Sequence, residues 1–295
     1  MPTKRSLLAF LLASLIAVPL FAWGEKGHYI ANEAATYGTP ADMPYFFHQA
    51  YPQLIYMSYD PDRWRGAGEA LDAVNPPNHF LDYEYVEGLD LPRDRYDFID
   101  LMIRTGRFRK YSIGISTTGF LPWRIAEVSD LLEQQWRFWR RLPAGMERSQ
   151  VEQNIIAISG VLGHYVADAS NPDHTTINYN GWVEPNPEHF PIDCDAHYRF
   201  ESGFVANSVE VSDVLPKLHP LVPRTDYFKT ALELIHESNS LVSTLYRIDR
   251  DGGFAYPYGT KEGKEFAVSR LASGASVMRD LWYSCWVNSG KSRRR

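Results

Sequence analysis

The chain has 295 residues, of which 44% are hydrophobic and 14% aromatic, and its formal net charge is −6. This length and apolar content suit one large globular domain, or at most two, and no internal repeat or low-complexity tract divides the sequence. The acidic charge argues against a passive nucleic-acid binder that relies on a broad basic patch. It leaves open an enzyme in which bound metal ions supply the local positive charge.

The first residues have the pattern of a secretory signal peptide. Lys4 and Arg5 precede an apolar run of 16 residues, 7–22, which is short for a membrane span. The small Ala22 is a suitable cleavage position, and cleavage there would make Trp23 the first residue. Loss of the two basic residues would take the charge from −6 to −8. We therefore expect a periplasmic or secreted protein, the alternative being an uncleaved anchor.

Helical periodicity dominates the rest of the chain, and period-2 alternation is scarce, so we predict an all-α domain. The pair Ser149 and Glu152 has the spacing of a capping box. Residues 51–92 are expected to be irregular, and the stretch 175–196, rich in Asn, Pro and Gly, to be a long ordered loop. Helices are expected over 25–37, 43–50, 97–105, 123–142, 149–169, 197–211, 226–247 and 262–287.

This domain is expected to span residues 23–290, followed by a basic, frayed tail at 291–295. The sequence contains two cysteines, Cys194 and Cys285. In an oxidising compartment one disulfide between them is plausible, and two unpaired buried thiols are the alternative.

The most informative stretch for function is Gly163–His174. His164 and Asp168 are four residues apart, so they share one face of the predicted helix, and Pro172 turns the chain just before His174. A second pair with the same spacing, His197 and Glu201, follows the long loop. Imidazole and carboxylate ligands together suit zinc. The alternative for each pair alone is a capping or core hydrogen bond.

Further ligand candidates precede this stretch, and together they form an ordered series. The motif Trp23-Gly24-x-x-Gly27-His28 would begin the mature chain. The full series is Trp23, His28, Asp62, His79, His164, Asp168, His174, His197 and Glu201. This series resembles the superfamily that joins bacterial zinc-dependent phospholipase C to the single-strand-specific zinc nucleases of fungi and plants. The resemblance runs from Trp23 to Glu201 and implies an all-α fold with three zinc ions in a cleft.

Carried over by position, the resemblance implies three ligand sets, of which the first and the third share Asp168. The sets are Asp62, His79, His164 and Asp168 for the first zinc, His174, His197 and Glu201 for the second, and the α-amino group and carbonyl of Trp23 with His28 and Asp168 for the third. Asp60 is a rival to Asp62. Because the α-amino group of Trp23 is free only after signal cleavage, cleavage is expected to be a condition of activity.

The implied reaction is metal-assisted phosphodiester hydrolysis. A hydroxide that bridges the first and third zinc ions would attack phosphorus in line. Arg65, three residues after Asp62, would stabilise the charged phosphate, a surface salt bridge being its alternative role. We therefore expect Asp62, Arg65 and Asp168 to be the catalytic residues.

Several details favour the nuclease branch, whose substrate is single-stranded DNA or RNA. The intervals of five residues from Trp23 to His28 and 23 from His174 to His197 are nuclease-like. Phe80 and Asp82 resemble nuclease residues that stack on a base and bond its edge, with core packing as the alternative for Phe80.

Other details depart from that pattern. Glu201 is phospholipase-like, the interval of 17 from Asp62 to His79 is long, and Asp173 precedes His174 where it could disturb the pocket. The alternatives are therefore a phospholipase C that acts on phospholipid, and a non-catalytic zinc-binding protein with a blocked cleft. A monomer without a stable protein partner is expected.

Overall fold

The computed structural model describes residues 23–291, so the predicted signal peptide and residues 292–295 of the predicted tail lie outside it. The first half contains α1 (Glu25–Tyr37), α2 (Tyr45–Gln49), α3 (Tyr51–Met57), α4 (Asp60–Arg63), α5 (Glu69–Val74), η1 (Pro76–His79), α6 (Tyr83–Val86), α7 (Arg95–Arg104), α8 (Arg107–Tyr111), α9 (Ile115–Thr118) and α10 (Leu121–Arg141). The second half contains α11 (Met146–Ser170), η2 (Pro172–Thr175), α12 (Ala196–Tyr198), η3 (Arg199–Phe204), α13 (Val205–Ser208), α14 (Val211–Val214), η4 (Leu215–Lys217), α15 (Tyr227–Asn239), α16 (Val242–Arg250) and α17 (Lys261–Ser289).

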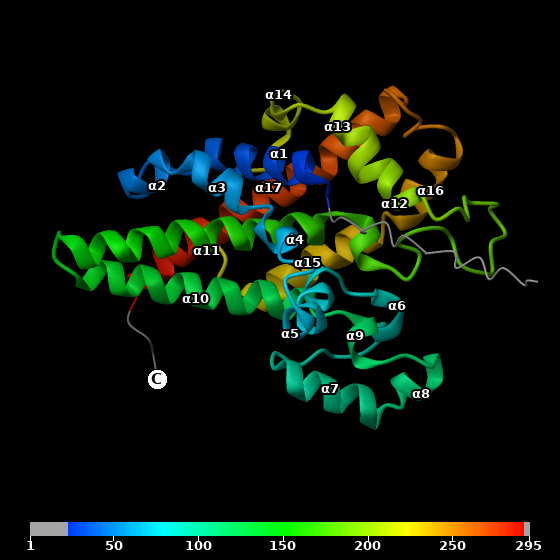
Figure 1. The fold of residues 1–295 in the computed structure, drawn as a ribbon, viewed down its shortest axis with the longest axis horizontal. Coiled ribbons are helices and arrows are strands. Elements are labelled where there is room, and N and C mark those ends of the chain that lie inside the picture. The colour runs from blue at the N-terminus through cyan, green and yellow to red at the C-terminus, as the bar shows by residue number, and fades with distance from the viewer. Residues whose placement is uncertain (1–22, 292–295) are drawn as a thin grey trace, which may run out of the picture.

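Three long helices form the centre of the molecule. α10 and α11 run side by side, α17 packs against both, and α1 and α3 cover α11 and α17 from one side (Figure 1). Between residues 23 and 291 the only strand-like pairing is two isolated bridges. The predicted all-α fold is therefore confirmed. None of the helices within residues 23–291 has the length and apolar character needed to cross a bilayer.

α11 is the helix around which the others pack, and its sequence explains its position. Its first half is partly exposed, whereas from Ser159 onward nearly every residue is buried. Small residues let neighbouring helices approach closely. A Cβ on Gly160 would lie 2.5 Å from Cβ of Met57, and one on Gly163 would lie 2.1 Å from Oδ1 of Asn32. The C-terminal turns of α11 are thus held from several sides.

The predicted capping box at Ser149 and Glu152 is wrong. α11 begins at Met146 with Gly145 as its N-cap residue, and the Ser149 amide already donates to the Gly145 carbonyl inside the helix. Glu152 instead accepts a hydrogen bond of 2.8 Å from the indole of Trp139 on α10. Contact with the neighbouring helix outweighs the local capping signal here.

Three other segments differ in detail from the expected helices. The region 51–92 is not irregular throughout, because it contains α3 to α6 and η1. The helix expected over 197–211 is divided into α12, η3 and α13, and η3 is a π-helix. The helix expected over 226–247 is interrupted at Ser240 and Leu241, between α15 and α16.

Within the predicted loop 175–196, Thr175 ends η2 and Ala196 begins α12, and the residues between them lack helix. This loop is tied to the rest of the fold by polar side chains. Glu84 accepts hydrogen bonds from the Thr176 hydroxyl and the Ile177 amide, and the phenol of Tyr246 accepts one from the Gly181 amide. Because these partners lie on α6 and α16, the loop is an ordered part of the structure.

The predicted disulfide is absent. Cys285 is buried in α17, where its thiol faces the Ser129 carbonyl at 3.4 Å, whereas Cys194 is exposed in the long loop. Both residues are free thiols. Cys285 belongs to the packing between α10 and α17, which leaves no path to an exposed partner.

Candidate metal centre

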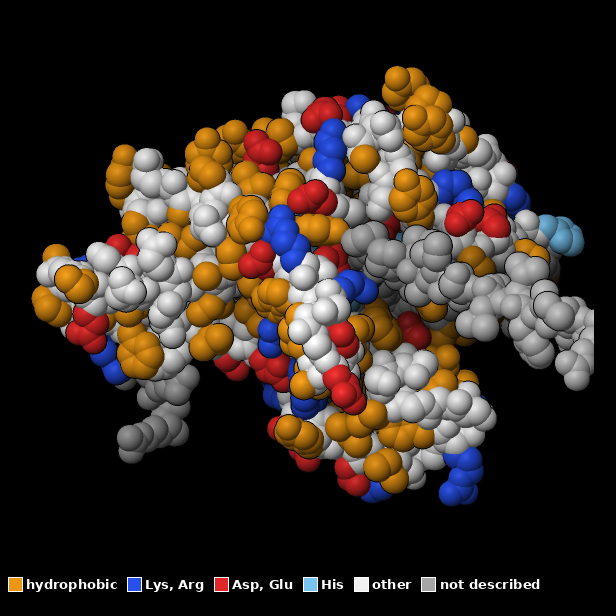
Figure 2. Space-filling model, in the orientation of Figure 1, with side chains coloured by type: hydrophobic (Ala, Val, Ile, Leu, Met, Phe, Trp, Pro, Cys, Tyr) orange, Lys and Arg blue, Asp and Glu red, His pale blue; other side chains and the backbone are white. Residues whose placement is uncertain are grey.

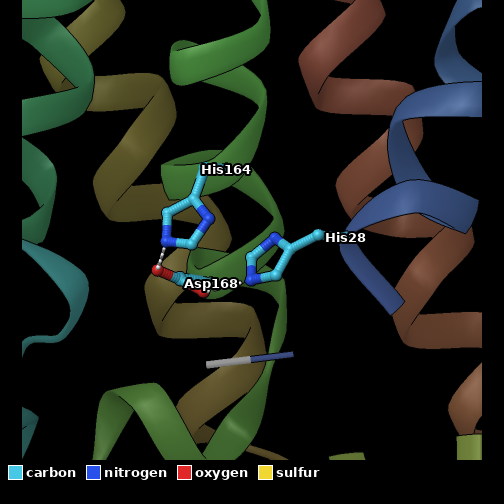
Figure 3. A group of neighbouring side chains, drawn as sticks. All are labelled: His28, His164 and Asp168. Carbon is cyan, nitrogen blue, oxygen red and sulfur yellow. Dashed lines mark ion pairs between the residues drawn. The ribbon is translucent and has the colours of Figure 1, made fainter. Parts of the chain in front are cut away.

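The C-terminal half of α11 and the start of α1 bring together the first group of possible ligands. His28, His164 and Asp168 are completely buried, and Figure 3 shows the two imidazoles beside the carboxylate. His28 Nε2 lies 3.5 Å from Asp168 Oδ1, and His164 Nε2 lies 3.3 Å from Asp168 Oδ2. The i,i+4 spacing on one helix, predicted from the sequence, produces this convergence.

Asp62 and His79 complete this cluster from two short elements, α4 and η1. His79 Nδ1 lies 3.1 Å from Asp168 Oδ2, 2.9 Å from His164 Nε2 and 3.9 Å from Asp62 Oδ1. Asp62 Oδ2 lies 4.0 Å from His28 Nε2. We call His28, Asp62, His79, His164 and Asp168 the Asp168 group.

The second cluster comes from less regular parts of the chain. His174 lies on η2, His197 on α12 and Glu201 on the π-helix η3. Glu201 Oε2 lies 2.8 Å from His197 Nε2 and 3.7 Å from His174 Nε2. Asn171, which the sequence analysis did not single out, donates to the same oxygen at 3.2 Å. We call His174, His197 and Glu201 the Glu201 group.

Backbone carbonyls orient two of these histidines. His164 Nδ1 lies 2.8 Å from the Ser58 carbonyl, and His174 Nδ1 lies 2.7 Å from the carbonyl of His79. A hydrogen bond to a carbonyl requires the proton on Nδ1, so each neutral ring presents the lone pair of Nε2 to its group. Such carbonyl partners are typical of metal-bound histidines. No local sequence pattern indicates the Ser58 contact, which is made across the fold.

Several buried polar atoms in the two groups have no hydrogen-bond partner. Buried polar atoms are otherwise nearly always paired, because an unpaired one loses its hydration without compensation. Here the unpaired atoms are nitrogen and carboxylate-oxygen atoms of the types that bind zinc. They are His28 Nδ1 and Nε2, Asp62 Oδ2, His79 Nε2, Asp168 Oδ1, His174 Nε2 and His197 Nδ1. The residues present therefore fit bound metal ions.

Burial also sets the protonation of both groups in a way that suits cations. It lowers the pKa of His28 and His79 well below the usual value and that of His164 to about 4, so these rings are neutral near pH 7. It raises the pKa of Asp168 to about 7 and that of Glu201 to about 8. Buried carboxylates need compensating positive charge to stay ionised, and metal ions would provide it.

Trp23 lies immediately before α1, whose His28 belongs to the Asp168 group. Its indole is completely buried, packs against Phe200 and donates a hydrogen bond of 2.8 Å to the Ala167 carbonyl, next to Asp168 in the chain. Gly27 keeps space for this ring, because a Cβ there would lie 3.1 Å from Cβ of Trp23. These contacts anchor the start of the described chain beside the Asp168 group.

A cavity of about 240 Å³ opens beside both groups. The substrate-binding candidates Phe80 and Asp82 line this cavity, as does Arg65. Its lining also includes residues that were not predicted to touch substrate, among them Thr117 and Tyr179. The lining residues are Arg65, Pro76, His79, Phe80, Asp82, Thr117, Asp173, His174, Tyr179 and His197.

The contacts of Arg65 and Asp60 bear on the alternatives that the sequence left open for these two residues. Arg65 donates to Asp62 Oδ1 through Nε at 2.9 Å and lies within 2.8 Å of it through Nη2, while the side chain lines the cavity. Asp60, the rival to Asp62, pairs with Arg63 at 2.9 Å and joins neither ligand group. The ion pair of Arg65 is therefore with a buried candidate ligand and not with a surface residue.

Comparison with known proteins identifies similar solved structures but no matching family. No protein-family model matches the chain, and no curated protein does so. Two solved structures are similar to it, an alpha-toxin from Clostridium absonum and an alpha-toxin from an avian strain of Clostridium perfringens. The first has 12% identity and a TM-score of 0.49, over 92% of this chain and 67% of the toxin. The second has 14% and 0.48, over 90% of this chain and 64% of the toxin. The chain thus spans about two thirds of the length of either toxin.

Proposed function

We propose that the protein is a secreted, zinc-dependent phosphodiester hydrolase that acts as a nuclease on single-stranded DNA or RNA. The observation that supports this most strongly is the pair of buried ligand groups, whose unpaired nitrogen and oxygen atoms converge beside a cavity lined by Arg65. Histidine and carboxylate ligands without cysteine suit a zinc site with open positions for substrate.

The proposed ligand sets are those that the resemblance implies, and the convergence of their side chains in the Asp168 and Glu201 groups supports them. Asp62, His79, His164 and Asp168 would hold the first zinc, and the Glu201 group would hold the second. His28, Asp168 and the α-amino group and carbonyl of Trp23 would hold the third. Bound zinc would supply Lewis acidity toward the phosphate and activate water for hydrolysis.

The protein's own residues would bind and orient the phosphodiester. Asp62 fixes Arg65 through Oδ1, so the guanidinium is held in place at the cavity wall with further donors for a phosphate oxygen. Thr117 lines the same wall. The ligand carboxylates are buried away from the cavity, which keeps their negative charge behind the metal sites and away from an approaching anion.

The choice of nucleic acid as substrate rests on Phe80 and Asp82. The backbone holds these residues firmly, because the amide of Leu81 donates to the His174 carbonyl at 3.0 Å and that of Asp82 to the Thr118 carbonyl at 2.9 Å. Phe80 and Asp82 both line the cavity, and the Asp82 side chain makes no capping hydrogen bond to α6, which begins after it. Both therefore remain available for an unpaired base, by stacking and by hydrogen bonding.

A side-by-side assay tests this function. Zinc-loaded protein that begins at Trp23 would be incubated with single-stranded DNA, RNA and phosphatidylcholine, each with and without chelator. A second form with one serine before Trp23 would test whether the free α-amino group is needed, through its zinc content and its activity. We expect chelator-sensitive cleavage of the nucleic acids, and a lower zinc content in the extended form.

The other outcomes would replace the proposal. Release of diacylglycerol without cleavage of nucleic acid would make the protein a phospholipase C, with Glu201 the better guide to its branch. Bound zinc with no turnover of any phosphodiester would leave a zinc-binding protein. Equal zinc content in the two forms would remove Trp23 from the ligand sets.

A further inference from the structure

Asp173 is a buried carboxylate in the cavity wall that the proposed chemistry does not use. The side chain is 2% exposed, and neither of its oxygens has a hydrogen-bond partner. It lines the cavity together with His174, His197 and Tyr179. Asp173 belongs to none of the ligand groups, whose atoms lie within 4.8 Å of one another.

The backbone around Asp173 is fixed, so its position in the wall is not that of a free loop. Asp173 lies on η2, and its amide donates to Asn171 Oδ1 at 3.1 Å. Asn171 also donates to Glu201, and the Thr175 hydroxyl closes the turn with a hydrogen bond of 2.7 Å to the Pro172 carbonyl. The Asp173 side chain is thus placed by the same turn that places His174.

No side chain of residues 23–291 donates a hydrogen bond to the Asp173 carboxyl group. Arg199 is engaged by Asp249 at 2.6 and 2.8 Å and by Asp193 at 2.8 Å. No Lys, Arg or His nitrogen of residues 23–291 lies within 4.0 Å of the Asp173 carboxyl oxygens as an ion-pair partner. An unpaired acceptor in the wall of a binding cavity calls for a donor on the bound molecule.

We propose that Asp173 accepts a hydrogen bond from the ribose 2′-hydroxyl of a nucleotide bound beside His174 and His197, so that the site favours RNA over DNA. This inference rests on the proposed nuclease function. Phe80 and Asp82 already account for the donors of a base edge. The donor that remains close to the phosphate of a nucleotide is the sugar hydroxyl, which distinguishes RNA from DNA.

Two substitutions separate the acceptor from the shape of the side chain. Asp173→Leu removes both acceptor atoms at similar volume, and Asp173→Asn keeps one acceptor oxygen without the charge. Asp90→Asn, at an exposed aspartate outside the cavity, is the matched control. Zinc content would be measured for each variant, because it separates a specificity role from a ligand role.

The substrates would be oligoadenylate and oligodeoxyadenylate of equal length, which differ only in the 2′-hydroxyl. We expect the wild-type protein to favour the ribose substrate by about tenfold in kcat/KM, as for one buried hydrogen bond. In the leucine variant, kcat/KM should fall on the ribose substrate and stay unchanged on the deoxyribose substrate, so that the preference is lost. The asparagine variant should lose part of the preference. Calorimetric binding of AMP and dAMP to the zinc-loaded protein should show the same ratios without turnover.

Other results would overturn the inference. Equal wild-type rates on the two substrates, or a preference unchanged in Asp173→Leu, would remove the 2′-hydroxyl contact while leaving the nuclease function intact. Loss of one zinc equivalent in Asp173→Asn would make Asp173 a metal ligand. Hydrolysis of phospholipid without cleavage of either oligonucleotide would instead refute the proposed function itself.

Discussion

The Asp168 group and the Glu201 group use the same kinds of side chain but are supported in different ways. His28, His164 and Asp168 lie on α1 and α11, helices of 13 and 25 residues that pack against α17. The Glu201 group is carried by a 3₁₀ turn, a three-residue helix and a π-helix. His174 and His197 also line the cavity, whereas His28 and His164 do not.

This difference indicates separate roles for the two groups. Regular, packed helices hold His28, His164 and Asp168 in place, whereas Asp62 and His79 complete this group from short elements. π-helices are uncommon and are frequently found at functional sites, and the Glu201 group lies beside the cavity at the edge of the long loop. We infer that the Asp168 group provides a rigid core for the chemistry, while the Glu201 group is the part that adapts to substrate.

Asp168→Asn should have the largest effect, because Asp168 contacts His28, His79 and His164 through its two oxygens. The side-chain amide nitrogen of asparagine cannot serve as a ligand, so we expect the loss of two of the three proposed zinc ions. Phosphodiester hydrolysis should fall by at least about 10³-fold, as for removal of central catalytic groups. Elemental analysis and initial rates measure these two effects.

The matched control is His219→Ala, since His219 lies outside both groups. It should retain all its zinc and nearly all its activity. If Asp168→Asn and His219→Ala bind the same amount of zinc, the assignment of the Asp168 group as a metal centre is wrong.

Glu201→Gln should have a smaller effect, confined to one ion. Glu201 bonds only within its own group and with Asn171. We expect one zinc equivalent to be lost and the rate to fall by roughly 10²-fold, with the Asp168 group still loaded. Glu147→Gln, an exposed residue in the first turn of α11, should change neither quantity. Loss of all three ions in Glu201→Gln would show that the two groups form one cooperative unit.

The sequence predicted the regular parts of this site better than the irregular ones. The helix containing His28 was placed at its observed bounds, and the i,i+4 spacing of His164 and Asp168 fixed their common face. These features depend on local periodicity. The π-helix at Glu201 could not be foreseen, because its form depends on contacts such as the Arg199 pairs with Asp193 and Asp249.

Contacts between residues far apart in the chain also explain why the sequence analysis did not find other residues of the site. The Ser58 carbonyl that orients His164 lies 106 residues away in the chain, and Tyr179 reaches the cavity only because the long loop folds back. No spacing rule relates such residues. Arg65, three residues after Asp62, pairs with that carboxylate and lines the cavity. Its role in catalysis stays a prediction.

The Asp168 group and the Glu201 group should also make the stability of the protein depend on pH. The sign of this dependence should differ between the metal-free and the zinc-bound protein. Burial raises the pKa of Asp168 to about 7 and of Glu201 to about 8, so the metal-free folded state binds protons that the unfolded state releases. That contribution to stability is present at low pH and is lost as the pH rises through 7 and 8. Zinc would reverse the dependence, because it binds the ionised carboxylates.

Thermal unfolding between about pH 7.5 and 8.5 tests this directly. In this window the buried histidines contribute little, because they are neutral in the folded state and their unfolded pKa, about 6.5, lies below the window. With chelator, the Tm of the wild-type protein should fall as pH rises, and the Tm of Asp168→Asn should fall less steeply. With zinc, Tm should rise or stay level. Identical slopes with and without zinc would argue against carboxylate ligands in either group.

The smallest effect is expected at the cysteines, away from both groups. Cys194 is exposed on the long loop and Cys285 is buried between α10 and α17, so no disulfide joins the loop to the core. The loop is instead held by Glu84 and Tyr246, which contact it near its start and its middle. Cys194→Ser and treatment with a reducing agent should therefore leave Tm and zinc content unchanged.

Tyr246→Phe removes the phenol that accepts from Gly181 and should lower Tm by a few degrees, equivalent to about 1 kcal/mol. A fall in Tm on reduction larger than that of Tyr246→Phe would show that a covalent link, and not these hydrogen bonds, holds the loop beside the Glu201 group.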